Sequence, residues 1–426
     1  MLTQLPKRLQ RSSSWHGMIL EAPGRPHTDA STHIRTPVST WIASILILGA
    51  FACAQPNVLS FGSLSPSIYL AGFSIVVVLL ADRGHATWLR SSGSAIFLIL
   101  LASIWQIARS TALGKDYQPF VLGTEAMGMV IVALAFLISN SARARFFAQL
   151  LIVVLAILSA SSFITAALTT TGTVIEIGKI PLGGFSGRLL FPFTPTSSIQ
   201  TAFGVPFPRF IGIGREPGWM GMYAGAAWFL VPLAFRGRRG RFWLRLSLMV
   251  GVLTPLSTGG FATFVMAASI LFMTSINRVP DAALRLLCRI AGVGIIAASI
   301  LVVWNAPVFG LANKAVQNAD SLEERTRLTT QGWQALQTFT LGQLSSERNA
   351  DISALASVVE WGWPYLLLIM AAILVPLLFT KNRGRVLAPV SVIAATLLLF
   401  QPPSGSTGAY VIVMLACGLT TQSDRR

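Results

Sequence analysis

The sequence predicts an all-α, polytopic membrane protein with about 12 transmembrane helices. Of its 426 residues, 53% are hydrophobic and 11% are charged, and the mean hydropathy is +0.67. A typical soluble domain has about 25% charged residues. The apolar residues also gather in separate runs that are long enough to cross a hydrocarbon core, which takes about 17–25 residues in a helix. Lipid is therefore the expected solvent for most of the chain.

The apolar runs follow one another with polar segments between them. The predicted spans occupy residues 38–55, 64–81, 92–108, 119–139, 146–168, 218–235, 242–256, 259–275, 287–305, 358–379, 386–400 and 406–421. The seventh and eighth come from one apolar stretch, 242–275, that is too long for a single span. Ser257-Thr258-Gly259-Gly260 interrupts this stretch, and its glycines favour a break between two helices.

Polar segments at both ends bound a single transmembrane domain at residues 38–421. Residues 1–37 carry five lysines and arginines and no apolar run, so we expect a disordered, basic cytoplasmic tail rather than a signal peptide. Residues 422–426 are expected to form a second short cytoplasmic tail. Two segments between spans, 169–217 and 306–357, are too long to be turns, and long ordered loops usually serve a function.

The distribution of charge predicts the orientation in the membrane. With an even number of spans and the N-terminus in the cytoplasm, cytoplasmic segments hold 22 of the 32 lysines and arginines but five of the 15 acidic residues. The entire formal charge of +17 then lies on one side, as the positive-inside rule requires. This explains the basic composition without nucleic acid as a partner. It predicts an inner-membrane protein with both termini cytoplasmic and both long loops on the outer side.

The first long loop ends in a cluster of charges beside a predicted span. Arg209 and Arg215 flank Glu216, and Pro217 suits the first turn of the helix that follows. Glu216 then lies at a helix N-terminus, where the dipole favours negative charge. Two interpretations remain open. The cluster is either an ordinary helix cap with interfacial arginines or an anion site, because arginine binds phosphates through two parallel hydrogen bonds.

The second long loop contains a predicted amphipathic helix. Ser321 and Glu324 make a capping box, so a helix is expected to start at Ser321 and to end near Gln337. Arg325 heads a mostly apolar face, and Arg327 follows two residues later. This helix is either a solvated surface element or a positively charged cover over the membrane surface.

Motifs for several other chemistries are absent from the sequence. It contains no GxxxxGK[ST] phosphate loop, no GxSxG elbow and no CxxC pair. Cys53, Cys288 and Cys417 lie far apart, and no outer cluster has metal-ligand spacing. Chemistry at the outer face is therefore expected to depend on arginines and carboxylates without metal or cofactor. Glu125 lies within the fourth span, where a carboxylate is by default a candidate functional group. Its position near the outer third of the span favours the alternative, a side chain that bonds a neighbour or reaches the interface.

The order of these features resembles that of the Wzy-type polysaccharide polymerases and the related O-antigen ligases. The resemblance covers roughly residues 119–380 and begins with Arg-x-x-Gly-x-x-x-Glu-Pro at Arg209–Pro217. The Ser-Thr-Gly-Gly break follows, and then a second loop with an arginine-bearing helix, Leu341-Gly342 and Glu360-Trp361-Gly362. These motifs are short, and their order carries the resemblance.

The resemblance implies a metal-independent glycosyltransferase of GT-C-like fold. Such enzymes polymerise undecaprenyl-diphosphate-linked oligosaccharide repeat units at the periplasmic face, with lipid-linked donor and acceptor, membrane lipid, a flippase and a chain-length regulator as partners. Arg209, Arg215, Arg325 and Arg327 carry over as diphosphate binders. Arg215 and Arg325, with Glu216, are the implied catalytic residues, and Glu216 would orient an arginine or the acceptor hydroxyl. Glu216, Asp351 and Glu360 all remain candidates for the general base.

Two departures from the family pattern bear on the function. Gly259-Gly260 stands where relatives often have an arginine, so one phosphate contact is expected to be missing or supplied elsewhere. The second loop lacks the histidine typical of the ligases, which favours a polymerase of exopolysaccharide or O-antigen units. An O-antigen ligase, a lipid-linked glycan flippase and a non-catalytic partner of an assembly complex remain the alternatives. A flippase usually carries charges within many spans and shows repeat symmetry, whereas here most of the charge lies outside the predicted spans and two long outer loops break any symmetry.

Overall fold

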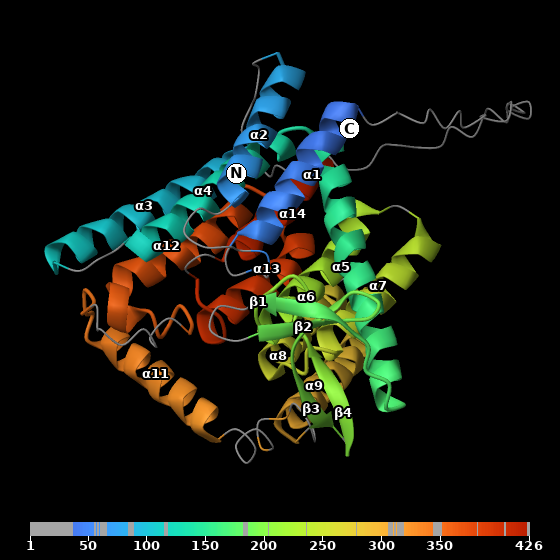
Figure 1. Cartoon of the computed structure of the whole chain (residues 1–426). Helices are drawn as coiled ribbons and strands as arrows, with labels where there is room; N and C mark the ends of the chain where they lie inside the picture. Colours follow the sequence, from blue (N-terminus) through green and yellow to red (C-terminus); the bar gives the residue numbers. More distant parts are fainter. Residues whose placement is uncertain are drawn as a thin grey trace, which may run out of the picture. The chain divides into compact units, whose positions relative to one another are not determined.

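The computed structural model describes residues 37–54, 57, 59, 66–83, 89–114, 118–181, 186–202, 204–235, 237–277, 279–305, 310, 312, 319–343, 352–380, 382–403 and 406–423. Across these residues the chain is mostly helical, with 13 named helices and a four-stranded sheet (Figure 1). They belong to the unit Pro37–Arg426. The predicted tail at residues 1–37 lies, except for Pro37, outside the described residues.

Every predicted apolar run coincides with one helix. These are α1 (Val38–Cys53), α2 (Pro66–Ala81), α3 (Arg90–Ala112), α4 (Gln118–Ile138), α5 (Ser141–Thr170), α6 (Pro217–Ala234), α7 (Arg238–Leu253), α8 (Thr258–Ile276), α9 (Ala282–Asn305), α12 (Val358–Leu378), α13 (Arg383–Leu399) and α14 (Thr407–Ser423). Of the helices in the described part, α3, α5, α8, α9 and α12 are long and apolar enough to cross a membrane. The chain therefore has the character of a membrane-embedded protein.

The first long loop folds into a sheet that the all-α prediction missed. Strands β1 (Glu176–Pro181), β2 (Ser186–Leu190), β3 (Thr194–Ala202) and β4 (Val205–Phe210) pair antiparallel in the order β1-β2-β3-β4. Strands of five to nine residues fall below the length of the apolar runs used to find spans, so that search could not detect them. The sheet is anchored on α5 by side-chain bonds, including Ser161 Oγ to Thr194 Oγ1 at 2.8 Å.

The second long loop contains α11 (Ala319–Gln337), which ends at the predicted residue but begins two residues before Ser321. Its inner face packs on the turn before α12. Leu328 is buried, and a Cβ at Gly332 would lie 2.2 Å from the carbonyl oxygen of Leu355. Figure 1 shows α11, in orange, beside α12. The predicted apolar face therefore contacts protein.

Two helices form the centre of the core. Nearly all side chains of α6 are buried, and so is the described run of α14 from Thr407 to Thr420. α6 approaches α8 closely, because a Cβ added at Gly221 would lie 3.0 Å from the Cα of Gly260. By contrast, α9 buries only Gly292 and exposes its large apolar side chains, as a lipid-facing helix does.

Candidate functional site

Arg209 reaches the candidate site from the last strand of the sheet. Its strand β4 pairs with β3, and the backbone N–H of Phe210 donates to Thr254 O across 3.5 Å, which ties the strand to the end of α7. Gly212 then turns the chain with φ +59°, where any Cβ would lie 2.3 Å from Met220 Sδ. This turn needs glycine, and it leads directly from Arg209 to the start of α6.

The N-terminus of α6 supplies the second side of the site. The helix begins at Pro217 with Glu216 at the N-cap, as the sequence predicted. Glu216 makes no side-chain capping bond, and its side chain is exposed. The carboxylate is therefore free of a capping role and lines the cavity described below.

The predicted break in residues 242–275 supplies a second helix N-terminus. α7 ends at Leu253 and α8 begins at Thr258, with Ser257 as N-cap accepting a hydrogen bond from the N–H of Gly260 at 3.3 Å. Glycine is required at both following positions by close packing. A Cβ at Gly259 would lie 2.8 Å from the ring of Phe400, and one at Gly260 would approach Gly221. The pair that departs from the family pattern thus lets two helix N-termini meet.

These segments enclose a cavity of about 850 Å³. Its charged lining is Arg209, Arg215, Glu216 and Arg325, the last from α11. Its other described lining residues are mostly hydroxyl-bearing, small or apolar: Ser197, Ser198, Pro217, Gly218, Ser257, Thr258, Gly259, Gly260, Leu322, Thr326, Thr329, Thr330, Thr396, Leu399, Phe400 and Gln401. Among the charged side chains, arginines outnumber carboxylates three to one. The lining therefore suits an anion.

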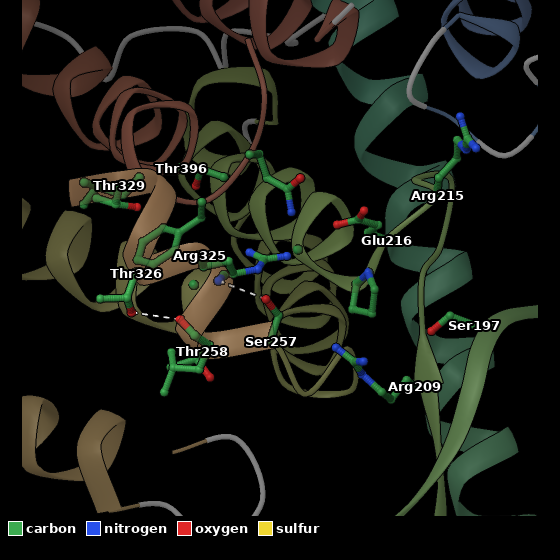
Figure 2. Close-up of a pocket in the computed structure, with 18 of the residues that line it drawn as sticks. Ser197, Arg209, Arg215, Glu216, Ser257, Thr258, Arg325, Thr326, Thr329 and Thr396 are labelled. Atoms are coloured by element: carbon green, nitrogen blue, oxygen red, sulfur yellow. Dashed lines mark hydrogen bonds between the residues drawn. The ribbon is translucent and has the colours of Figure 1, made fainter. Parts of the chain in front are cut away.

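Three of the charged groups act on one another electrostatically. Burial lowers the pKa of Arg209 from its ordinary value, the negative charge of Glu216 opposes that shift, and the positive charge of Arg325 adds to it. Figure 2 shows the guanidinium of Arg325 directed toward Glu216 between the two helix N-termini, with Arg209 below. Arg325 and Arg209 therefore face a common space from opposite sides, although they are 116 residues apart in sequence.

The five predicted site residues do not share one environment. Arg215 lines the same cavity, but Figure 2 shows its guanidinium turned away from Glu216. Arg327 makes a two-point pair with Glu324, at 2.7 and 2.9 Å, and it is not among the described lining residues. The structure thus brings together Arg209, Glu216 and Arg325. Diphosphate binding by any of the predicted arginines stays a prediction.

The other candidate carboxylates lie elsewhere. Glu360 is buried in the first turn of α12 and does not line the cavity in the described part of the chain. Asp351 and the side chain of Glu125 fall outside the described residues. Across the described ranges, no three His, Cys, Asp or Glu side chains are grouped as metal ligands. Of the candidate bases in the described part of the chain, Glu216 is the one that lines the cavity.

Gln401, just after α13, is a lining residue that the sequence analysis missed. It is 4% exposed, and none of the hydrogen bonds in the described residues uses its side-chain amide. A Cβ at Gly218 would lie 2.2 Å from its Nε2, so the amide sits against the first turn of α6. The available signal was a polar residue at the end of an apolar run, directly before Pro402-Pro403. An amide that lines the cavity without a protein partner in the described residues is available to bond a ligand.

Comparisons with protein-family models, curated proteins and solved structures find no match to this chain. The chemistry of the site therefore has to be argued from its residues.

Proposed function

We propose that the protein polymerises polyprenyl-diphosphate-linked oligosaccharide repeat units at the periplasmic face of the bacterial inner membrane, as a metal-independent glycosyltransferase. One observation carries the proposal: Arg209 and Arg325 converge with the N-termini of α6 and α8 on one cavity. Helix N-termini and arginines together are the protein features best suited to hold a diphosphate. The product is an exopolysaccharide or an O-antigen chain.

Twelve helices cross the membrane in this proposal, with both termini in the cytoplasm. Contacts between segments of predicted common side support it. Arg143 at the start of α5 pairs with Asp82 at the end of α2, and both belong to predicted cytoplasmic segments. On the predicted periplasmic side, Arg109 donates to Gly342 O, and Asn57 forms a bridge with Gly214. The cavity then lies at the periplasmic surface, formed by the two long loops.

The reaction is a displacement at the anomeric carbon of the donor. A hydroxyl at the non-reducing end of the acceptor attacks that carbon, the carbon–oxygen bond to the diphosphate breaks, and the carrier diphosphate leaves with the electron pair. Negative charge grows on the leaving diphosphate, where Arg209, Arg325 and the backbone N–H groups at the helix N-termini would stabilise it. Glu216 accepts the proton of the attacking hydroxyl.

Complementation of a deletion strain tests this function. The deletion and the variants Arg209→Ala, Arg325→Ala and Glu216→Ala are expected to make little or no polymer and to accumulate single repeat units on the outer leaflet. Loss of one charge-assisted hydrogen bond costs about 1.5–3 kcal/mol, or roughly 10- to 100-fold in rate. Arg327→Ala is the matched control, since Arg327 is turned to Glu324, and its polymer yield is expected to stay within about 2-fold of wild type.

The products separate this proposal from its rivals. The surface polysaccharide would be sized on gels, and protein levels would be measured by immunoblot. Repeat units that accumulate on the inner leaflet would identify a flippase. Normal polymer on the carrier lipid, without transfer to its final acceptor, would identify a ligase. Wild-type polymer from the Arg209 and Arg325 variants would refute the site.

A further inference from the structure

Two arginines on α7 lie on the inward face of the helix, at the end opposite to the cavity. Arg241 and Arg245 are four residues apart, and the same helical stripe continues through Leu248 and Val252, which are 0% and 1% exposed. The stripe therefore changes from apolar to basic toward the start of α7. Surface charge alone does not explain arginines on the inward face of a helix, because their side chains there lose part of their contact with water.

The guanidinium of Arg245 stacks on an aromatic ring of the neighbouring helix. Its guanidinium carbon lies 4.4 Å from the centroid of Trp228 on α6, within the range of a cation–π contact. Arg245 follows Arg238, the first residue of α7, by seven positions, or about 10 Å of helix. Its Nε is buried without a hydrogen-bond partner in the described residues. The ring thus fixes the guanidinium in a place where its Nε makes no hydrogen bond within the described residues.

Arg241 presents a second partly used guanidinium one turn away. Its Nε donates to the carbonyl oxygen of Phe235 at 2.7 Å, which caps the end of α6. None of the hydrogen bonds in the described residues uses its two terminal nitrogens. Like charges at this spacing repel, so Arg241 and Arg245 favour an anion between them.

No carboxylate of the described chain supplies that anion. The ion pairs among the described residues join Arg143 to Asp82, Arg188 to Glu176 and Arg327 to Glu324. Arg143, also at a predicted cytoplasmic helix end, instead pairs its two terminal nitrogens with an acid of the chain itself, Asp82. Arg241 and Arg245 therefore form no ion pair among the described residues, and an external anion can bind them.

The surroundings indicate where that ligand comes from. Phe242 and Trp243, between the two arginines in sequence, are 60% and 66% exposed, and in the proposed twelve-helix topology they face lipid. Arg241, in the first turn of α7, then lies near the level of the lipid headgroups, with Arg245 one turn deeper. Basic side chains between helices on the cytoplasmic side are typical of binding sites for anionic phospholipids.

We infer that Arg241 and Arg245, with Trp228, bind the phosphodiester of an anionic phospholipid in the cytoplasmic leaflet. Arg245 binds the phosphate oxygens while its face stays on the indole, and Arg241 binds them from the helix end. The inference depends on the membrane embedding and the orientation, and it does not depend on the polymerase activity.

Native mass spectrometry of the purified protein tests the site with phosphatidylglycerol and phosphatidylcholine as probes. Wild type is expected to retain phosphatidylglycerol at least 10-fold better than phosphatidylcholine at equal concentration. Arg245→Gln and Arg241→Gln are expected to lose most of this preference. Arg245→Lys keeps the charge but not the planar fork, so it is expected to restore only part of it.

Arg239→Gln is the matched control, because Arg239 is exposed on another face of the same helix. It removes the same charge, and it is expected to leave lipid retention unchanged. Equal losses from Arg239→Gln and Arg245→Gln would overturn the site in favour of diffuse surface charge. Full displacement of phosphatidylglycerol by millimolar inorganic phosphate would overturn the lipid assignment. An acidic partner protein that co-purifies and binds in a lipid-independent way, with loss in the Arg245 variant, would overturn it as well.

Discussion

At the residue scale, Arg209 is a partly buried positive charge that lines the cavity, where a ligand could bind it. Burial lowers its pKa, and Glu216 partly offsets that effect. Arginine nevertheless stays protonated at neutral pH because its ordinary pKa is so high. Its Nε is buried without a hydrogen bond in the described residues. A diphosphate would satisfy this nitrogen and remove part of the cost of burying the charge.

The role of Gln401 in substrate binding can be tested by adding one methyl group at the neighbouring Gly218. In Gly218→Ala the new Cβ would meet Nε2 of Gln401, which must then move away from the start of α6. Polymer formation is expected to fall by about 10-fold, the effect of one lost hydrogen bond to substrate. Folding is expected to survive, because the obstacle is the end of a flexible side chain and alanine favours helix more than glycine does.

Two quantities would be measured for Gly218→Ala and wild type: polymer formation and the thermal unfolding temperature of the purified protein. Gly237→Ala is the control, because a Cβ there meets nothing within 4 Å. If Gly218→Ala polymerises like wild type at an unchanged unfolding temperature, Gln401 has no role in substrate binding.

At the element scale, α11 is the element that brings Arg325 to the cavity. Its second half is held close to the chain that enters α12, by Gly332 against Leu355. Beyond its end, the N–H of Trp363 donates to Thr340 O at 3.1 Å, and the N–H of Gln343 donates to Val359 O at 2.9 Å. The position of Arg325 therefore depends on packing about two turns away.

Gly332→Ala is expected to push α11 away from this support, because a Cβ would lie 2.2 Å from a backbone oxygen that cannot rotate aside. Overpacking of this kind costs about 1–3 kcal/mol. Both the unfolding temperature and polymer formation should fall, the latter through displacement of Arg325. Gln334→Ala, at an exposed position of the same helix, is the control and should change neither. Wild-type activity and stability in Gly332→Ala would show that α11 is not held by this contact.

At the scale of the whole molecule, the distribution of charge predicts the orientation in the membrane, and contacts between helix ends join segments that are predicted to lie on the same side. The α2–α5 pair Asp82–Arg143 and the α3 contact of Arg109 with Gly342 each join segments on one predicted side. An inverted topology would place the basic cluster of α7 in the periplasm, against the positive-inside rule.

Labelling with a membrane-impermeant maleimide tests the orientation in cells. Cys53, Cys288 and Cys417 would first be replaced, and Ser186→Cys or Gly240→Cys would be introduced at exposed positions. Ser186→Cys in β2 is expected to react in intact spheroplasts, and Gly240→Cys in α7 only after the membrane is permeabilised. The reverse pattern would contradict the orientation and would put the cavity on the cytoplasmic side.

The positions of the helices were predictable from the sequence because they depend on local properties. A helix in lipid must be an unbroken apolar run, so each predicted span coincides with a helix, and the break at Ser257–Gly260 appears where the glycines indicated. The cluster at Arg209–Pro217 and the end of α11 at Gln337 were predictable for the same reason. The sheet was not, because short strands depend on pairing with one another.

Only the tertiary structure decided which charges meet. Arg325 and Arg327 are two residues apart in sequence and were both predicted to bind diphosphate, yet helix rotation turns one toward the cavity and the other toward Glu324. Gln401 and the convergence of two helix N-termini depend on contacts between α6, α8 and α13 that no local pattern encodes. The sequence by itself determined a membrane-embedded helical chain and its charged loops, because hydrophobicity and charge are properties of single residues. The geometry of the site depends on long-range packing, so it required the fold.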